Sequence, residues 1–185
     1  LQDALGRESY VVHGFGLPAI SAAAYGGQQV YRSAASTAPD VLALMLGTND
    51  AHWGFNEAAY RRQMTELVVN FQSPVQRSKV LLISPPPLWR NGIFGGMQQN
   101  LINEELPRIL RELSTELGCV FVDINHAMFA AGFDGDSSCD GCHLYPSGQE
   151  FIARAVYQLI TNLFVPPPSP RVPPPSPLLP PPPPF

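Results

Sequence analysis

Short apolar runs alternate along this chain with longer segments in which apolar residues recur at helical spacing. Runs of this kind are too short for helices and predict strands, which we expect at Tyr10–Val12, Val41–Leu46, Val80–Ile83 and Val120–Asp123. Apolar positions three and four residues apart predict helices at Glu57–Phe71, Leu101–Leu117 and Ser147–Leu163. Strands that alternate with helices favour an α/β domain with a parallel sheet covered by helices on both faces.

Local signals refine the ends of these elements. Leu1–Leu5 has the pattern of the end of a helix that Gly6 stops. Pro107 lies inside an otherwise helical pattern, so we expect a kink or a break into two helices there. Ser147 and Glu150 have the spacing of a capping box, which predicts that the last helix starts at Ser147.

The composition changes sharply after Val165, which divides the chain into a domain over 1–165 and a tail over 166–185. The tail consists mostly of proline, which removes backbone donors and fixes φ. We expect a polyproline II rod that acts as a stiff linker or stalk, or that binds a polyproline-reading domain or a further domain. Its Pro-Pro-Pro-Ser-Pro repeats resemble wall glycoproteins of plants and green algae, which would fit a secreted or cell-wall protein.

Composition narrows the classes of partner. Of 185 residues 45% are hydrophobic, which is enough for a core, while a net charge of −4 disfavours nucleic acid or an anionic membrane surface. No apolar stretch reaches the eighteen or so residues that a membrane span needs. The three cysteines Cys119, Cys139 and Cys142 do not make a disulfide framework, although one pairing that leaves one thiol free stays open.

Two polar motifs follow the predicted elements at places where sites form. Val41–Leu46 leads into Gly47-Thr48-Asn49-Asp50, so Asn49 lies just past the carboxyl end of a buried strand. An amide at that point can donate a hydrogen bond to a developing oxyanion. Asp140 and His143 lie three residues apart before the last helix. A carboxylate that holds one imidazole nitrogen lets the other nitrogen take a proton from a nucleophile.

In this order and at this separation the two motifs resemble the blocks of the SGNH (GDSL-type) hydrolases. The last block is Asp140-Gly141-Cys142-His143, followed by Leu-Tyr-Pro where the family usually has Pro-Asn. The resemblance implies a flavodoxin-like three-layer α/β/α fold and ester hydrolysis through an acyl-enzyme, with no metal or organic cofactor. It makes His143 the base, Asp140 the residue that orients it and Asn49 an oxyanion donor. The sequence looks most like carbohydrate acetylesterases, including sialate O-acetylesterase-like members, so the expected substrate is a carbohydrate or similar small ester.

The Gly block of the family should follow the first visible strand, where the chain has His13-Gly14-Phe15-Gly16-Leu17-Pro18-Ala19. The natural register puts Gly16 on the first Gly of the block and Ala19 on the second, whose backbone N–H is an oxyanion donor. An Ala keeps that N–H but tolerates fewer backbone conformations than Gly. A glycine turn without a catalytic role is the alternative.

The Ser block of the family, G-D-S after an apolar strand, should lie upstream of Tyr10, beyond the start of the printed chain. We therefore expect the nucleophilic Ser and the first strand to be missing, and residues 1–185 alone to be inactive and poorly stable. Gly135-Asp136-Ser137 spells the same tripeptide, but no apolar strand precedes it, so Ser137 is disfavoured as the nucleophile.

Two other classes of protein stay open. One is a non-catalytic wall protein whose domain binds carbohydrate and whose proline stalk carries the function. The other is a haem carrier, because Cys139-Asp140-Gly141-Cys142-His143 spells the c-type attachment pattern. The alternating α/β pattern is wrong for a small cytochrome. A calcium loop from Asp134 is disfavoured because Cys139 stands where such a loop needs Gly.

Overall fold

The computed structural model describes residues 10–164, and these form an α/β domain around a three-stranded parallel sheet. The strands are β1 (Val41–Leu44), β2 (Lys79–Ile83) and β3 (Val120–Val122), in the spatial order β1-β2-β3. The register pairs Val41 with Lys79 and Leu81 with Val120. The α/β class and the parallel direction of the strands are those expected from the sequence. The tail and Leu1–Leu5 lie outside the described residues.

The central strand β2 is buried on both faces, which explains its uniformly apolar sequence. Val80 and Leu82 belong to one core cluster, whereas Leu81 and Ile83 belong to the other. Because successive side chains of a strand point to opposite faces, these four residues link the two cores through one strand.

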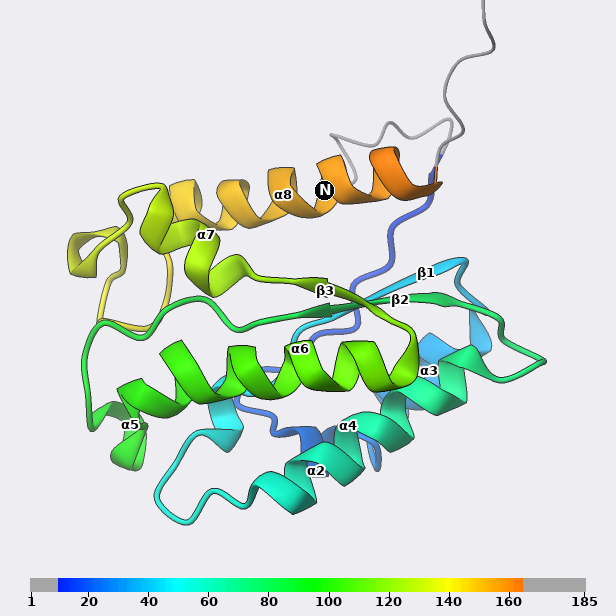
Figure 1. Ribbon diagram of the computed structural model, residues 1–185, viewed down its shortest axis with the longest axis horizontal. Helices are drawn as coiled ribbons and strands as arrows, with labels where there is room; N and C mark the ends of the chain where they lie inside the picture. Colours follow the sequence, from blue (N-terminus) through cyan, green and yellow to red (C-terminus); the bar gives the residue numbers. More distant parts are fainter. Residues whose placement is uncertain (1–9, 165–185) are drawn as a thin grey trace, which may run out of the picture.

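Helices cover the sheet on both faces (Figure 1). On one face α4 (Glu57–Gln72) and α6 (Leu106–Leu117) contact β2 and each other. On the other lie α7 (Ile124–Ala130) and α8 (Pro146–Phe164), packed on one another. Within the described residues no helix is both long and apolar enough to cross a bilayer.

Six short elements complete the domain within residues 10–164. They are α2 (Ala22–Tyr25), α3 (Gln29–Ser36), the 3₁₀ turns η1 (Thr48–Asp50) and η3 (Gly135–Ser137), α5 (Ile93–Gly96) and the π-helical turn η2 (Leu101–Glu105). The sequence predicted a helix at the position of one of them, η2, and did not predict the other five. The turn η2 runs directly into α6, where Pro107 lies in the first turn. A proline is tolerated there because its missing N–H has no partner in a first turn. The break expected at Pro107 is therefore this π-to-α switch.

Two expectations about individual elements were wrong. Tyr10–Val12 is not a strand, and the chain from residue 10 to residue 17 runs without regular structure. A run of three apolar residues is too short for its pattern to distinguish a strand from an irregular segment. The capping box is also wrong, because α8 begins at Pro146 and Ser147 therefore lies inside the helix. Proline is favoured at the first helical position, where φ is already set.

The edge of β1 that faces away from β2 borders a cavity of about 850 Å³. The other wall is the irregular stretch around Tyr10–Leu17, while Phe71 of α4 and Ile160 of α8 close the two sides. The ladder begins with the Lys79 N–H donating to the Asp40 carbonyl at 2.9 Å. Alternation along a parallel ladder then turns the backbone groups of Val41 and Ala43 toward the cavity. Within residues 10–164 no strand pairs with this edge.

Gly47, which ends the β1 segment, provides a test of this packing. Its φ is +136°, and an added Cβ would lie 2.9 Å from Leu106 Cδ1 and 3.1 Å from Tyr60 Oη. Gly47→Ala should therefore lower the free energy of unfolding by about 1–3 kcal/mol, as overpacking does, when measured by urea denaturation. Gly54→Ala is the matched control: its φ is +88°, but nothing lies within 4 Å, so the loss should be smaller. Equal losses would contradict the packing argument.

Candidate active site

Asp140 and His143 form one hydrogen-bonded unit in the loop before α8. His143 Nδ1 lies 2.7 Å from Asp140 Oδ2, while Asp140 Oδ1 accepts the backbone N–H groups of Cys142 at 2.9 Å and His143 at 2.8 Å. These bonds, led by the one from the His143 backbone, lower the pKa of Asp140 from 3.8 to about 2. The carboxylate is thus ionised and can only accept, which places the shared proton on Nδ1 and leaves Nε2 as the acceptor.

The loop takes this shape because Gly141 packs closely against the segment that follows β2. Gly141 has φ +93°, and a Cβ there would lie 2.5 Å from Arg90 Cβ. The Trp89 N–H donates to the Gly141 carbonyl at 2.9 Å, and Ser138 Oγ accepts the Gly141 N–H at 2.8 Å. Only glycine fits at position 141. The segment after β2 therefore fixes where Asp140 and His143 stand.

The ring of His143 faces solvent on one side and Phe94 on the other. Its side chain is 68% exposed, and the ring of Phe94 meets it edge-on with centroids 5.3 Å apart. Phe94 belongs to α5, where it adopts a left-handed conformation with φ +47°. No sequence pattern predicts this contact, because it depends on how the glycine-rich segment 92–96 folds.

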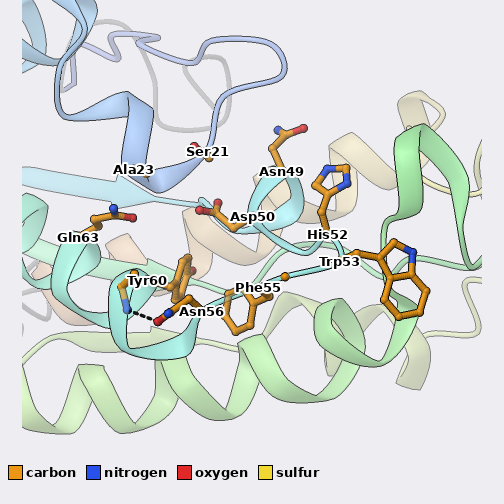
Figure 2. Close-up of a pocket in the computed structure, with 12 residues that line it drawn as sticks. Ser21, Ala23, Asn49, Asp50, His52, Trp53, Phe55, Asn56, Tyr60 and Gln63 are labelled. Atoms are coloured by element: carbon orange, nitrogen blue, oxygen red, sulfur yellow. Dashed lines mark hydrogen bonds between the residues drawn. The ribbon is translucent and has the colours of Figure 1, made fainter.

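Asn49 lies in η1, directly after β1, and lines a cavity of about 280 Å³ (Figure 2). Its side-chain amide makes no hydrogen bond to another described residue. Figure 2 shows Asn49, His52 and Trp53 one after another along this cavity. The position of Asn49 after β1 agrees with the expectation from the sequence. The sequence did not predict that His52 and Trp53 line the same cavity.

The adjacent Asp50 joins this turn to the segment that contains Gly16 and Ala19. Both its carboxylate oxygens lie 3.0 Å from the backbone N of Ala22, and burial raises its pKa. Sequence analysis gave Asp50 no role of its own. The structure makes it the bridge between the two segments from which oxyanion donors were expected.

Gly16 and Ala19 lie on an exposed loop between the irregular start of the chain and α2. Ala19 has φ +52°, so the backbone keeps the left-handed conformation that a glycine would favour, despite the Cβ. Gly16 has no neighbour within 4 Å of an added Cβ. Ala19 was expected to tolerate fewer backbone conformations than a Gly. It nevertheless adopts the left-handed conformation, at the cost of backbone strain.

The hydroxyl groups of the described serines near the site have other partners. Ser137 Oγ donates to Asp134 Oδ1 at 3.2 Å and accepts the Asp134 N–H at 3.1 Å, which forms the capping box of η3. Ser21 Oγ accepts the Ala24 N–H at 3.3 Å at the start of α2. Neither hydroxyl is hydrogen-bonded to His143 in the part of the chain that the structure describes.

The segment that follows β2 touches both halves of the candidate site. Gln98 donates from its backbone to the Ala51 carbonyl at 2.8 Å and from its side chain to the His52 carbonyl at 2.9 Å. Farther back, Trp89 is bonded to Gly141, as described above. No hydrogen bond among residues 10–164 joins Asn49 to His143 directly, so this segment is what connects them.

The two cysteines of the C-x-x-C-H pattern lie in different environments, because Cys139 is exposed and Cys142 is half-buried. Cys142 packs against the core, and burial raises the pKa of its thiol to about 11, so its nucleophilic thiolate is scarce. Cys119, Cys139 and Cys142 are all free thiols. In the described part of the chain, no three His, Cys, Asp or Glu side chains are grouped so that they could hold a metal ion.

The lowered pKa of Asp140 predicts how the loop responds to acid. A folded-state pKa of about 2, against 3.8 ordinarily, means that the carboxylate stabilises the fold above about pH 4 and that this contribution is lost as the pH falls toward 2. Asp140→Asn should therefore lower the stability at pH 6, and the difference from the parent should shrink by about pH 2, measured by denaturant unfolding.

The matched control is Asp136→Asn, an exposed residue in the same loop, which should change stability little at either pH. A difference between the parent and Asp140→Asn that stayed constant from pH 6 to about pH 2 would contradict the assignment.

Comparisons with known proteins identify solved structures that share this fold. Solved structures with the same fold include a carbohydrate acetylesterase from Sinorhizobium meliloti, at 24% identity and TM-score 0.68 over 88% of this chain and 83% of that one. An aryl esterase from M. smegmatis matches at 22% identity and TM-score 0.68, over 88% and 82%. An acetylxylan esterase from Geobacillus stearothermophilus matches at 17% and 0.62, over 77% and 68%.

At these identities the structures show a shared fold. The chain has no match among the curated protein sequences with which it was compared. The model of the GDSL-like lipase/acylhydrolase family matches residues 1–151, which is most of the chain. The fold, the two polar motifs and this match agree, and the chain belongs to the GDSL-like lipase/acylhydrolase family as an SGNH-type esterase.

Proposed function

We propose that this domain hydrolyses carboxylic esters on carbohydrates or similar small neutral alcohols by a Ser-His-Asp acyl-enzyme mechanism. The observation that carries the proposal is the 2.7 Å contact between His143 Nδ1 and Asp140 Oδ2, which leaves Nε2 open toward solvent. His143 Nε2 accepts the proton of the nucleophilic hydroxyl and then returns it to the leaving alcohol. Asp140 holds the tautomer and stabilises the imidazolium that forms in between.

The oxyanion that develops at the ester carbonyl needs donors that are already in place. The Asn49 amide, without a partner among the described residues, is the side-chain donor in this proposal. The backbone N–H groups of Gly16 or Ala19 supply the second, and Asp50 holds the two segments together through its bonds to Ala22. A carbohydrate substrate is supported by the relative from Sinorhizobium meliloti, which is a carbohydrate acetylesterase.

The nucleophile in this proposal is a serine outside the described residues. The Ser137 hydroxyl is engaged by Asp134, and that of Ser21 accepts a backbone N–H. The cavity beside β1 is lined by residues up to Leu46, three residues before Asn49. An apolar strand seated there, parallel to β1, would end beside the candidate oxyanion donors. A serine at the end of that strand would reach the site.

The first test uses residues 1–185 preceded by an apolar strand and a Gly-Asp-Ser turn. This protein should hydrolyse p-nitrophenyl acetate, and His143→Ala should lower kcat/KM by about 10³-fold or more, because the general base of the triad is lost. His126→Ala, which removes an exposed histidine on α7, is the control and should leave the rate unchanged. Retention of more than about a tenth of the activity by His143→Ala would refute the base assignment.

The second test, in the same protein, concerns the oxyanion donor. Asn49→Ala should lower kcat by ~10²–10³-fold, the usual loss for one such donor, without a change in the melting curve. Asn162→Ala, an exposed asparagine of α8, provides the comparison. An unchanged kcat for Asn49→Ala would refute the role of Asn49 as an oxyanion donor and show that Gly47-Thr48-Asn49-Asp50 is only a turn.

A further inference from the structure

The 280 Å³ cavity beside Asn49 is lined by polar groups of an unusual kind. Its hydrogen-bonding side chains are mostly uncharged amides and an imidazole, from Asn49, His52, Asn56 and Gln63. Asp50 is the acid among the described lining residues, and both its oxygens already face the Ala22 backbone N. Among the described residues, neither Lys nor Arg lines the cavity. A neutral ligand rich in hydroxyl groups fits this chemistry better than an anion or a cation.

Several of these groups have unused hydrogen-bonding capacity. Within residues 10–164, neither the side-chain amide of Gln63 nor the imidazole of His52 forms a hydrogen bond, as is also true of Asn49. Asn56 uses Oδ1 to accept the Ala59 N–H at 2.9 Å, the bond drawn in Figure 2, which leaves its NH₂ group as a donor. The cavity is therefore lined by several hydrogen-bond donors and acceptors, which recognition of several hydroxyl groups requires.

Trp53 adds an aromatic surface at one end of the cavity. The indole is 75% exposed, which is high for a tryptophan in a folded domain. It is nevertheless held in place, because it packs on Gly96 so closely that an added Cβ would lie 2.4 Å from Trp53 Cδ1. The two bonds from Gln98 to residues 51 and 52 tie the segment under the ring to the segment that carries it. The ring is thus positioned before a ligand arrives.

We infer that this cavity is a saccharide subsite, in which one neutral sugar ring stacks on Trp53 and the hydroxyl groups of a neighbouring ring of the same saccharide bond to Gln63 and Asn56. Asn49 and His52 lie between these two ends of the cavity (Figure 2), so an acyl group on the bound saccharide lies beside Asn49. The inference rests on the proposed function, which it narrows to O-acylated neutral saccharides. Aryl esters are the competing class of ligand for an exposed indole.

The experiment measures binding to residues 1–185, so it does not depend on turnover. Xylotriose and mono-O-acetylxylotriose are titrated in ligand-observed NMR experiments against the parent chain, Trp53→Ala, Trp53→Phe and Gln63→Ala. Trp53→Ala should raise the Kd roughly three- to tenfold, since one aromatic stacking contact is lost. Trp53→Phe should restore most of the affinity, and Gln63→Ala should raise the Kd by a similar factor through a lost hydrogen bond.

Phe129→Ala, which removes another exposed aromatic ring, from α7, is the matched control and should leave the Kd unchanged. Melting curves of all variants show whether each remains folded. Equal affinity of Trp53→Ala and the parent would overturn the inference. Saturable binding of phenyl acetate but not of xylotriose would also overturn it and assign the cavity to aryl groups.

The outcomes also separate this inference from the proposed function. If xylotriose binds through Trp53 while the protein carrying a Gly-Asp-Ser segment does not cleave p-nitrophenyl acetate, the subsite stands and the catalytic proposal fails. If that protein cleaves p-nitrophenyl acetate while xylotriose does not bind residues 1–185, the catalytic proposal stands and the saccharide subsite is refuted.

Discussion

The parallel pairing of β2 with both of its neighbours is the constraint on which the rest of this domain depends. Because β2 is buried on both faces, its side chains tie the α4/α6 core to the α7/α8 core. Parallel pairing also aligns the carboxyl ends of all three strands at one edge of the sheet. The η1 turn after β1 and the long segment after β2 leave the sheet from that edge.

The segment after β2 connects the Asn49 turn to the loop that contains Asp140 and His143. Asn103, in the π-helical turn η2, anchors the start of this segment. Its side chain accepts the Leu88 N–H at 2.9 Å and donates to the Leu88 carbonyl at 2.8 Å. Farther along, the same segment contacts the Asp140–His143 loop through Trp89 and the Asn49 turn through Gln98. Backbone hydrogen bonds and two tight glycine contacts, at Gly96 and Gly141, thus set the spacing between Asn49, Trp53 and His143.

The open edge of β1 contrasts with this order. A buried sheet normally leaves no unpaired backbone beside a cavity, because each unsatisfied group costs free energy. Here Val41 and Ala43 face a cavity of about 850 Å³ bounded by helices of both layers. The walls are mostly apolar, so a strand that filled the cavity would be apolar on both faces.

The sequence by itself determined the features that depend on local patterns. Short apolar runs located β1, β2 and β3 to within two residues at each end, because runs of this length are too short for helices and favour strands. Tyr10–Val12 shows the limit of the same reasoning, since a run of only three apolar residues does not distinguish a strand from an irregular segment. The pairing of Asp140 with His143 was expected from the resemblance of this block to the family motif, and the structure places His143 Nδ1 2.7 Å from Asp140 Oδ2.

Only the tertiary structure decided which distant residues meet. Phe94 reaches His143 and Trp53 rests on Gly96 because the segment after β2 folds through left-handed residues, a path that no periodic pattern encodes. Asp50 became a bridge to Ala22 because the α2 segment packs against the turn after β1. Contacts of this kind depend on loop geometry and on the packing of separate elements. Local propensity carries no information about either.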